Sequence, residues 1–219
     1  MSEPSFAHLA SLGHELASAA LCPRRPSEHA EWEREQASAA RRVVADAEAS
    51  AARELASLAK RTTPALARAV LTGTREDTDA VRLVLRWVDS GRRGLLLRGG
   101  VGAGKSFAAA LAVHKLGEAS WHRPNDFVSA VLHAYDDAAP KLSKRLVVID
   151  DVGRETKTDF EEALCAFLDD SDARFILTAN LTRDDFSKRY DLRLIDRLND
   201  CAVAATAKGE SRRKQTGGF

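Results

Sequence analysis

The sequence predicts an α/β fold in which a parallel sheet is covered by helices on both faces, preceded by an α-helical N-terminal region. From about residue 95 onward, short apolar runs alternate with helical patterns, as is typical of parallel strands buried on both faces. A glycine-rich loop, GGVGAGKS at residues 99–106, stands between the first apolar run and a helical pattern. We therefore expect a helical region over residues 1–65 and one three-layer α/β domain over residues 66–219.

The composition is that of a soluble globular protein, and the spacing of its cysteines fits a reducing compartment. Apolar residues make up 44% of the 219 residues and charged residues 30%, and the net charge of +1 excludes a globally basic nucleic-acid binder. Cys22, Cys165 and Cys201 are widely spaced, which disfavours a zinc site or disulfide framework. The N-terminus lacks a basic segment, and no apolar run approaches the roughly 20 residues that span a bilayer. We expect a cytoplasmic protein with no membrane partner.

A long helix is predicted between Ser27 and Arg61, because this stretch lacks Gly and Pro and is rich in Ala, Glu and Arg. Ser27 is placed to cap it. Its apolar positions fall three, four or seven residues apart and mark one narrow face: Trp32, Ala39, Val43, Ala47, Ala51, Leu55 and Leu58. Two interpretations stay open, a helix packed on its own domain and an arm that docks on a protein partner.

The remaining elements follow in order after Pro64, which we expect to end the long helix. The patterns predict helices over residues 76–89, 106–117, 126–135 and 157–170, with two short helices within 183–199. They predict strands over residues 95–97, 146–149, 175–178 and 202–207.

The loop from residue 99 to residue 106 predicts a phosphate-binding site. Its glycines let the backbone turn N–H groups inward around the β- and γ-phosphates, and the following helix points its positive end at the anion. Lys105 is expected to reach these phosphates and the Ser106 hydroxyl to ligate Mg²⁺. The predicted ATP-binding residues of the loop are Gly99, Gly100, Val101, Gly102, Ala103, Gly104, Lys105 and Ser106. A purely structural Gly-rich turn is the alternative.

Polar residues at the ends of two later strands fit the same site. Asp150 follows the strand at 146–149 and is predicted to hold Mg²⁺ together with Ser106. Asp151 is then placed to orient and polarise the attacking water. Asn180, after the strand at 175–178, can reach the γ-phosphate or that water. The alternatives are a solvated pair of acids and an ordinary turn asparagine.

Arg197 is the remaining candidate for catalysis. An arginine can stabilise the charge that develops on a transferred phosphoryl group, often from a neighbouring subunit. The alternative is a surface ion pair, for instance with Asp196 or Asp200.

Taken together, the motifs resemble a family. GGVGAGKS, VVIDDVG (147–153), LTANL (177–181), IDRL (195–198) and GESRR (209–213) occur in the order seen in DnaC-type replicative helicase loaders, and they are equally similar to IstB-type transposition helper ATPases. The resemblance covers about residues 66–219. It implies a P-loop NTPase fold of the AAA+ kind without a full C-terminal lid, for which the chain end at Phe219 leaves no room.

The resemblance also implies roles for individual residues. Asn180 would be sensor 1, Arg197 the arginine finger, and Arg213 a contact of the nucleotide, with Arg212 as the alternative. Many AAA+ proteins have Glu at the position of Asp151, so we expect slow hydrolysis that depends on assembly or on DNA.

The function so implied is ATP-dependent loading of a hexameric, DnaB-like replicative helicase onto single-stranded DNA during replication initiation. The N-terminal region would bind the helicase, and the ATP-bound chain would form a homo-oligomer. The rivals are a transposition helper that recruits a transposase and a non-catalytic ATP-dependent scaffold. Few aromatic residues are available for base stacking; Phe127 and Tyr135 are candidates, with core packing the alternative for Phe127.

Overall fold

The computed structural model describes residues 26–72, 77–132, 142 and 145–209. The chain divides into two compact units, residues 1–51 and 52–219. In the first unit the described residues belong to helix α2 (Pro26–Arg61), which continues into the second unit and confirms the predicted long helix. Most of the side chains of residues 31–51 are exposed, including Val43 at 69%. The Ala-rich part of α2 in this unit therefore buries little apolar surface of its own.

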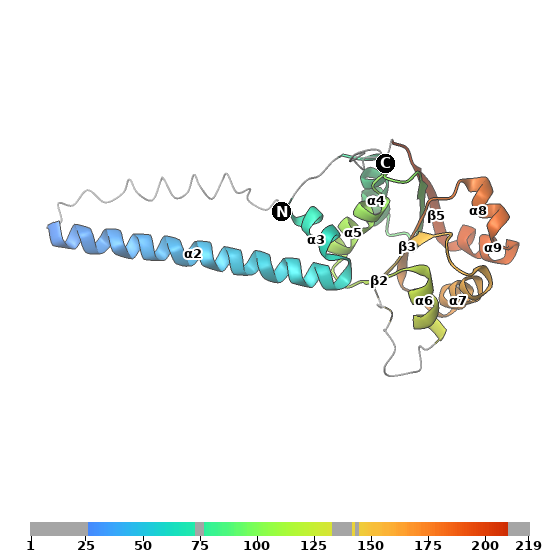
Figure 1. Ribbon diagram of the computed structural model, residues 1–219, viewed down its shortest axis with the longest axis horizontal. Coiled ribbons are helices and arrows are strands. Elements are labelled where there is room, and N and C mark those ends of the chain that lie inside the picture. The colour runs from blue at the N-terminus through green and yellow to red at the C-terminus, as the bar shows by residue number, and fades with distance from the viewer. Residues whose placement is uncertain (1–25, 73–76, 133–141, 143–144, 210–219) are drawn as a thin grey trace, which may run out of the picture. The chain divides into compact units, whose positions relative to one another are not determined.

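The second unit is an α/β sandwich (Figure 1). Its further helices are α3 (Pro64–Leu71), α4 (Asp79–Ser90), α5 (Lys105–Leu116), α6 (Pro124–Leu132), α7 (Lys157–Asp170), α8 (Arg183–Arg189) and α9 (Leu192–Cys201). Its strands are β1 (Gly94–Gly99), β2 (Ser120–His122), β3 (Leu146–Val152), β4 (Arg174–Ala179) and β5 (Ala202–Ala207). Among the described residues these strands form one parallel sheet in the order β2-β3-β4-β1-β5.

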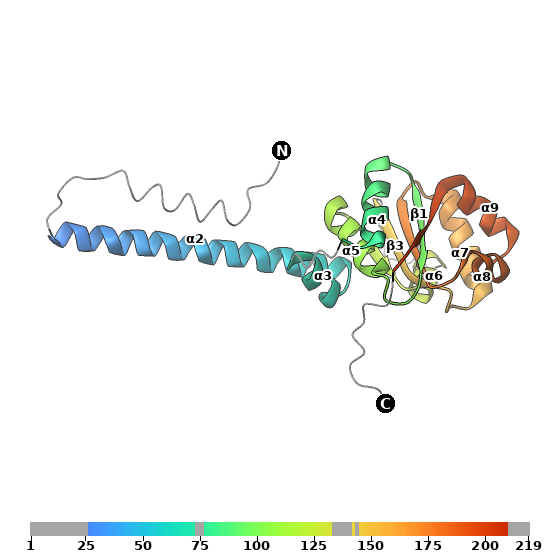
Figure 2. The same ribbon diagram turned by 90° about the horizontal axis from the view of Figure 1, so that it is seen from above.

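Successive side chains of each strand enter different cores, one on each face of the sheet. Leu95 and Leu97 pack with α3, α4, α5 and the end of α2, whereas Leu96 packs with α6, α7, α8 and α9. Figure 2 shows α4 and α5 on one side of the strands and α7, α8 and α9 on the other. The three-layer parallel α/β fold predicted from the sequence is therefore confirmed.

The C-terminal end of α2 belongs to the first of these cores. Leu58 is fully buried there, and the Arg61 guanidinium donates to the carbonyl of Gly117. Helix α2 ends at Arg61, before Pro64 as predicted, and Pro64 begins α3, which Thr63 caps by accepting from the backbone N–H of Leu66 over 3.3 Å. The division predicted between residues 65 and 66 stays a prediction, and this packing makes residue 52 the better place to cut the chain.

The sequence patterns did not locate α3 or β2. Strand β2 is the three residues Ser-Trp-His, too short to show an alternating pattern. Phe127 is fully buried and contacts Phe167 edge-on, so its alternative assignment to the core is confirmed, whereas Tyr135 lies outside the described residues. Within the described part of the chain, none of the helices combines the length and the apolar character that crossing a bilayer would need.

Candidate functional site

The glycine-rich loop runs from the end of β1 to the start of α5, as predicted. Gly99 has φ of 149°, and a side chain there would place Cβ 2.6 Å from the carbonyl oxygen of Ala207 on β5. Gly104, with φ of 83°, is the N-cap of α5. Gly99 needs glycine because of this close approach, and the backbone of Gly104 is in the left-handed conformation that residues with a side chain rarely adopt. The loop therefore leads directly into the N-terminus of α5, whose first N–H groups have no partner within the helix.

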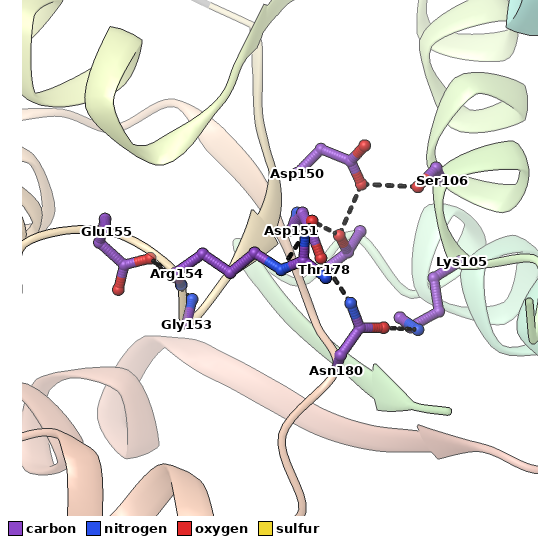
Figure 3. A network of polar contacts seen from close by, with 9 residues as sticks. All are labelled: Lys105, Ser106, Asp150, Asp151, Gly153, Arg154, Glu155, Thr178 and Asn180. Atoms are coloured by element: carbon purple, nitrogen blue, oxygen red, sulfur yellow. Dashed lines mark hydrogen bonds and ion pairs between the residues drawn. The ribbon is translucent and has the colours of Figure 1, made fainter. Parts of the chain in front are cut away.

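Lys105 is the first residue of α5, and its ammonium group joins a polar network through Asn180 (Figure 3). Nζ donates to the carbonyls of Gly99 and Gly100 over 2.8 and 2.7 Å, and to Asn180 Oδ1 over 2.7 Å. Burial lowers the pKa of Lys105, while the negative charges of Asp151 and Asp150 act in the opposite direction. The lysine thus places a cation between the loop and the end of β4.

The strand order explains why residues far apart in sequence meet here. Strand β4 lies between β1 and β3, so the residues that follow β1, β4 and β3 share one edge of the sheet. The Ser106 hydroxyl donates to Asp150 Oδ1 over 2.8 Å, and the Thr178 hydroxyl donates to the same oxygen over 2.6 Å. Asp150 is therefore fixed by one hydroxyl from α5 and one from β4.

A β-bulge sets the positions of Asp150 and Asp151. Ile149 pairs with Leu177 and Val152 with Ala179, so two residues of β3 face the single residue Thr178 of β4. Asp151 has a positive φ of 67°, which is uncommon for a residue with a side chain. Its backbone N–H donates to Thr178 Oγ1 over 2.9 Å. The Thr178 hydroxyl thus satisfies the backbone of one acid and the carboxylate of the other.

The Asp151 carboxylate is held by two neighbours. Asn180 Nδ2 donates to Oδ1, and Arg154 Nε lies 3.6 Å from Oδ2. Asn180 therefore joins Asp151 to Lys105, as Figure 3 shows. This arrangement fixes the orientation of the side chain predicted to polarise water.

The loop after Asp151 is tied to the junction between α8 and α9. Glu155 is buried and accepts from the backbone N–H groups of Gly153 and Arg154 over 2.7 and 2.8 Å. The Tyr190 hydroxyl donates to its other carboxylate oxygen, and Arg189 Nη2 donates to its backbone carbonyl over 2.6 Å. Burial, and then the Glu155 carboxylate, raise the pKa of Tyr190, so this hydroxyl stays a donor.

Five of the predicted side chains line one pocket of about 460 Å³: Lys105, Ser106, Asp150, Asp151 and Asn180. Val101, Gly102 and Gly104 line it as well, and Gly99, Gly100 and Ala103 complete the loop. Sequence reasoning missed the four other lining residues, Phe107, Arg123, Arg154 and Thr178. Thr178 carried a signal, since it is a polar residue within an otherwise apolar strand.

Arg197 is not among the residues that line this pocket. It lies on α9, where Nε and Nη2 donate to the two carboxylate oxygens of Asp169, both over 2.8 Å. The ion pair suggested as its alternative role therefore exists, but with Asp169 on α7 and not with Asp196 or Asp200. The other predicted arginine, Arg213, lies outside the described residues, as does Arg212.

The pocket offers oxygen ligands of the kind that Mg²⁺ prefers. The Ser106 hydroxyl and the Asp150 carboxylate already lie within hydrogen-bond distance of each other. In the described part of the chain, no group of three or more His, Cys, Asp and Glu side chains forms a metal site. A few protein oxygens completed by phosphates and waters are the usual Mg²⁺ environment of phosphoryl-transfer sites, so these residues fit that ion.

The Gly-rich loop after β1, its Lys105 and the two acids of β3, Asp150 and Asp151, decide the fold assignment. The fold is that of a P-loop NTPase. No protein-family model matches the sequence, and no curated protein sequence matches it.

Some solved structures are similar to the chain. A "putative primosome component" from Streptococcus pyogenes serotype M3 has 22% identity, covers 62% of this chain and 81% of its own, and gives a TM-score of 0.43. Replication initiator DnaA bound to AMPPCP and single-stranded DNA has 17% identity, covers 64% of this chain and 50% of its own, and gives a TM-score of 0.45. AMPPCP-bound DnaA from Aquifex aeolicus has 20% identity, covers 59% of this chain and 44% of its own, and gives a TM-score of 0.42. The chain spans half or less of these two DnaA chains, and the fold assignment rests on its own sheet order and loop geometry.

Proposed function

We propose that the unit formed by residues 52–219 binds ATP with Mg²⁺ and hydrolyses the ATP. One observation carries this proposal: side chains from α5, β3 and the end of β4 that sequence reasoning assigned to phosphate, metal and water converge on one pocket. A Gly-rich turn with only a structural role would not require a lysine, a hydroxyl and two carboxylates at the same edge of the sheet.

The loop and Lys105 would bind the β- and γ-phosphates. Backbone N–H groups of the loop and of the first turn of α5 supply fixed donors, and the helix dipole favours the anion. The Lys105 ammonium sits on a flexible four-carbon stem, so it can exchange the carbonyls of Gly99 and Gly100 for phosphate oxygens. This exchange makes Lys105 the residue on which ATP affinity depends most.

Ser106 and Asp150 would hold the magnesium ion, which neutralises negative charge on the phosphates when bound. Asp151 would orient the attacking water and accept its proton, with Asn180 holding one carboxylate oxygen in place. Aspartate is one methylene shorter than glutamate, so we expect a low turnover rate. A non-catalytic scaffold would bind ATP through the same loop without measurable turnover.

Arg197 would act on the pocket of a second copy of the chain. It lies on α9 and pairs with Asp169, and it is not among the residues that line the pocket of its own chain. A guanidinium that contributes to hydrolysis from this position must therefore reach across an interface, which makes an ATP-bound homo-oligomer part of the proposal.

At the level of biology, we propose an AAA+ loader of a hexameric replicative helicase onto single-stranded DNA. The order of the five motifs supports this role. The exposed side chains of residues 31–51 on α2 support it too, because a long helix with a narrow apolar face suits docking on a partner helix. The same motifs suit a transposition helper, and the choice between a helicase and a transposase is left to experiment.

The test measures phosphate release by the full chain over a range of protein concentrations, with and without single-stranded DNA. We expect specific activity to rise with concentration in the wild type and to stay low in Arg197→Ala, while both bind an ATP analogue equally. A flat specific activity together with a fully active variant would exclude the role in a second copy. Co-purification of the full chain with the helicase or with a transposase from the same source then decides the partner.

A further inference from the structure

The pair between Arg197 and Asp169 connects α7 and α9, which pack in the same core on one face of the sheet. Asp169 is the residue before the last of α7, and Arg197 lies in the middle of α9. Both hydrogen bonds are 2.8 Å long, so the guanidinium and the carboxylate meet in a two-point contact. The hydrogen bond from Arg197 also holds the pKa of Asp169 below its ordinary value, which keeps the pair charged.

The backbone that carries Arg197 is fixed independently of this pair. Leu194 and Leu198, on either side of Arg197, are buried in the core formed with α7. Asp191 caps the helix by accepting from the backbone N–H of Leu194 over 2.8 Å. The position of α9 therefore does not depend on Asp169, whose side chain controls only where the guanidinium points.

The contact with Asp169 uses only the edge of the guanidinium that carries Nε and Nη2. The bonds run from Nε and Nη2, so the Nη1 end of Arg197 takes no part in the contact with Asp169. A long arginine side chain samples many rotamers, and a two-point contact restricts it to one orientation. Such fixed cations stabilise a developing negative charge better than mobile ones, because they need no reorganisation during the reaction.

The surface around the pair has the charge expected of a contact with the pocket of another copy. A groove beside Asp169 and α9 carries Glu161, Glu162, Asp170 and Asp191 together with Arg193. The nucleotide pocket presents the exposed Arg123 and Arg154 beside Asp150 and Asp151, and Arg154 Nε lies 3.6 Å from Asp151 Oδ2. The acidic groove of one copy and the exposed Arg123 at the pocket of the next are complementary in charge.

We propose that Asp169 is a positioning residue, which holds the Arg197 guanidinium toward the nucleotide pocket of a second copy of this chain. The proposal rests on the proposed function, since it needs Arg197 to act between copies. It assigns to Asp169 a role that is expressed only in the copy that donates the arginine. The copy that supplies the pocket does not need its own Asp169.

This asymmetry permits a sharp test by mixing variants. Asp151→Asn supplies Arg197 but should turn over ATP on the order of a hundredfold more slowly, and Arg197→Ala supplies an intact pocket without the arginine. Mixed in equal amounts, they should recover phosphate release well above the sum of the separate activities. Adding Asp169→Asn to the Asp151→Asn chain should then lower the recovered turnover on the order of tenfold, with an unchanged KM for ATP.

Two matched controls complete the experiment. Asp172→Asn makes the same change at an exposed residue outside the acidic groove, and in the Asp151→Asn chain it should leave the recovered turnover unchanged. Asp169→Asn placed instead in the Arg197→Ala chain should also have no effect, because that chain has no arginine to position.

If the two parent variants fail to complement, Arg197 does not act between copies, and the positioning role of Asp169 is then wrong as well. If they complement but Asp169→Asn is silent, or acts equally in either chain, the ATPase proposal stands and the positioning role is wrong.

Discussion

The Thr178 hydroxyl donates to Asp150 Oδ1 over 2.6 Å and joins β4 to β3 at the β-bulge. The same oxygen of Thr178 accepts the backbone N–H of Asp151. One hydroxyl on a buried side chain thus supports both acids of the proposed site.

Thr178→Val keeps the shape of this side chain and removes its hydroxyl. We expect the free energy of unfolding to fall by about 1–3 kcal/mol, because the Asp151 N–H loses its acceptor and Asp150 loses a donor. Phosphate release should fall as well, since both carboxylates would lose support. Chemical denaturation and turnover measure the two effects. Thr178→Ser is the matched control and should restore both, whereas a serine variant as impaired as the valine variant would assign the effect to packing of the methyl group.

Lys105→Ala should weaken ATP binding by more than about tenfold, or ~1.4 kcal/mol. The side chain supplies the cation that the loop and Asn180 surround, and alanine supplies no charge at that place. Titration with a fluorescent ATP analogue measures the affinity. Lys115→Ala, an exposed position on the same helix, is the control and should bind as the wild type does. Equal affinity of all three proteins would remove the basis for assigning the loop to phosphate.

Asp150→Asn and Asp151→Asn should separate metal binding from water activation. Asp150→Asn should reduce the dependence of nucleotide binding on Mg²⁺, because the ion loses a charged partner beside Ser106. Asp151→Asn should preserve binding and lower turnover on the order of a hundredfold. Binding titrations at several Mg²⁺ concentrations and phosphate release measure the two properties, with the exposed Asp172→Asn as a control. The two roles are not distinct if both variants lose nucleotide affinity to the same extent.

The sequence is sufficient for the elements whose signals are local. The Gly-rich loop and the acids after β3 have fixed chemistry at fixed spacing, so the sequence alone places Lys105, Ser106 and Asp150 in one site. The partner of Arg197 could not be predicted, because Asp169 lies on another helix and only the packing of α7 against α9 brings the two side chains together. The bulge at Asp151 and the part played by Thr178 depend on strand pairing, which composition and periodicity do not reveal.

The boundary of the proposed ATPase unit could not be predicted from the sequence either. A proline at residue 64 marks the end of a helix, and the sequence therefore suggests a division at residue 65. Sequence pattern does not decide whether the preceding helix packs on the domain. The burial of Leu58 and the contact of Arg61 with Gly117 provide a physical basis for a different cut.

Residues 52–219 should fold alone and bind ATP as the full chain does, whereas residues 66–219 should be less stable. The shorter piece lacks Leu58, a fully buried side chain in the core of α3, α4 and α5.

In the full chain, Leu58→Ala should lower the free energy of unfolding by about 2–5 kcal/mol, since it leaves a cavity in that core. Val43→Ala, at a position that is 69% exposed, should change it by less than about 0.5 kcal/mol. Chemical denaturation and binding of an ATP analogue test all four proteins. If residues 66–219 prove as stable as residues 52–219, and Leu58→Ala matches Val43→Ala, the end of α2 is dispensable to the core and the division belongs at residue 65. If the full chain captures a helicase, and residues 52–219 bind nucleotide but not that helicase, the docking role is assigned to residues 1–51.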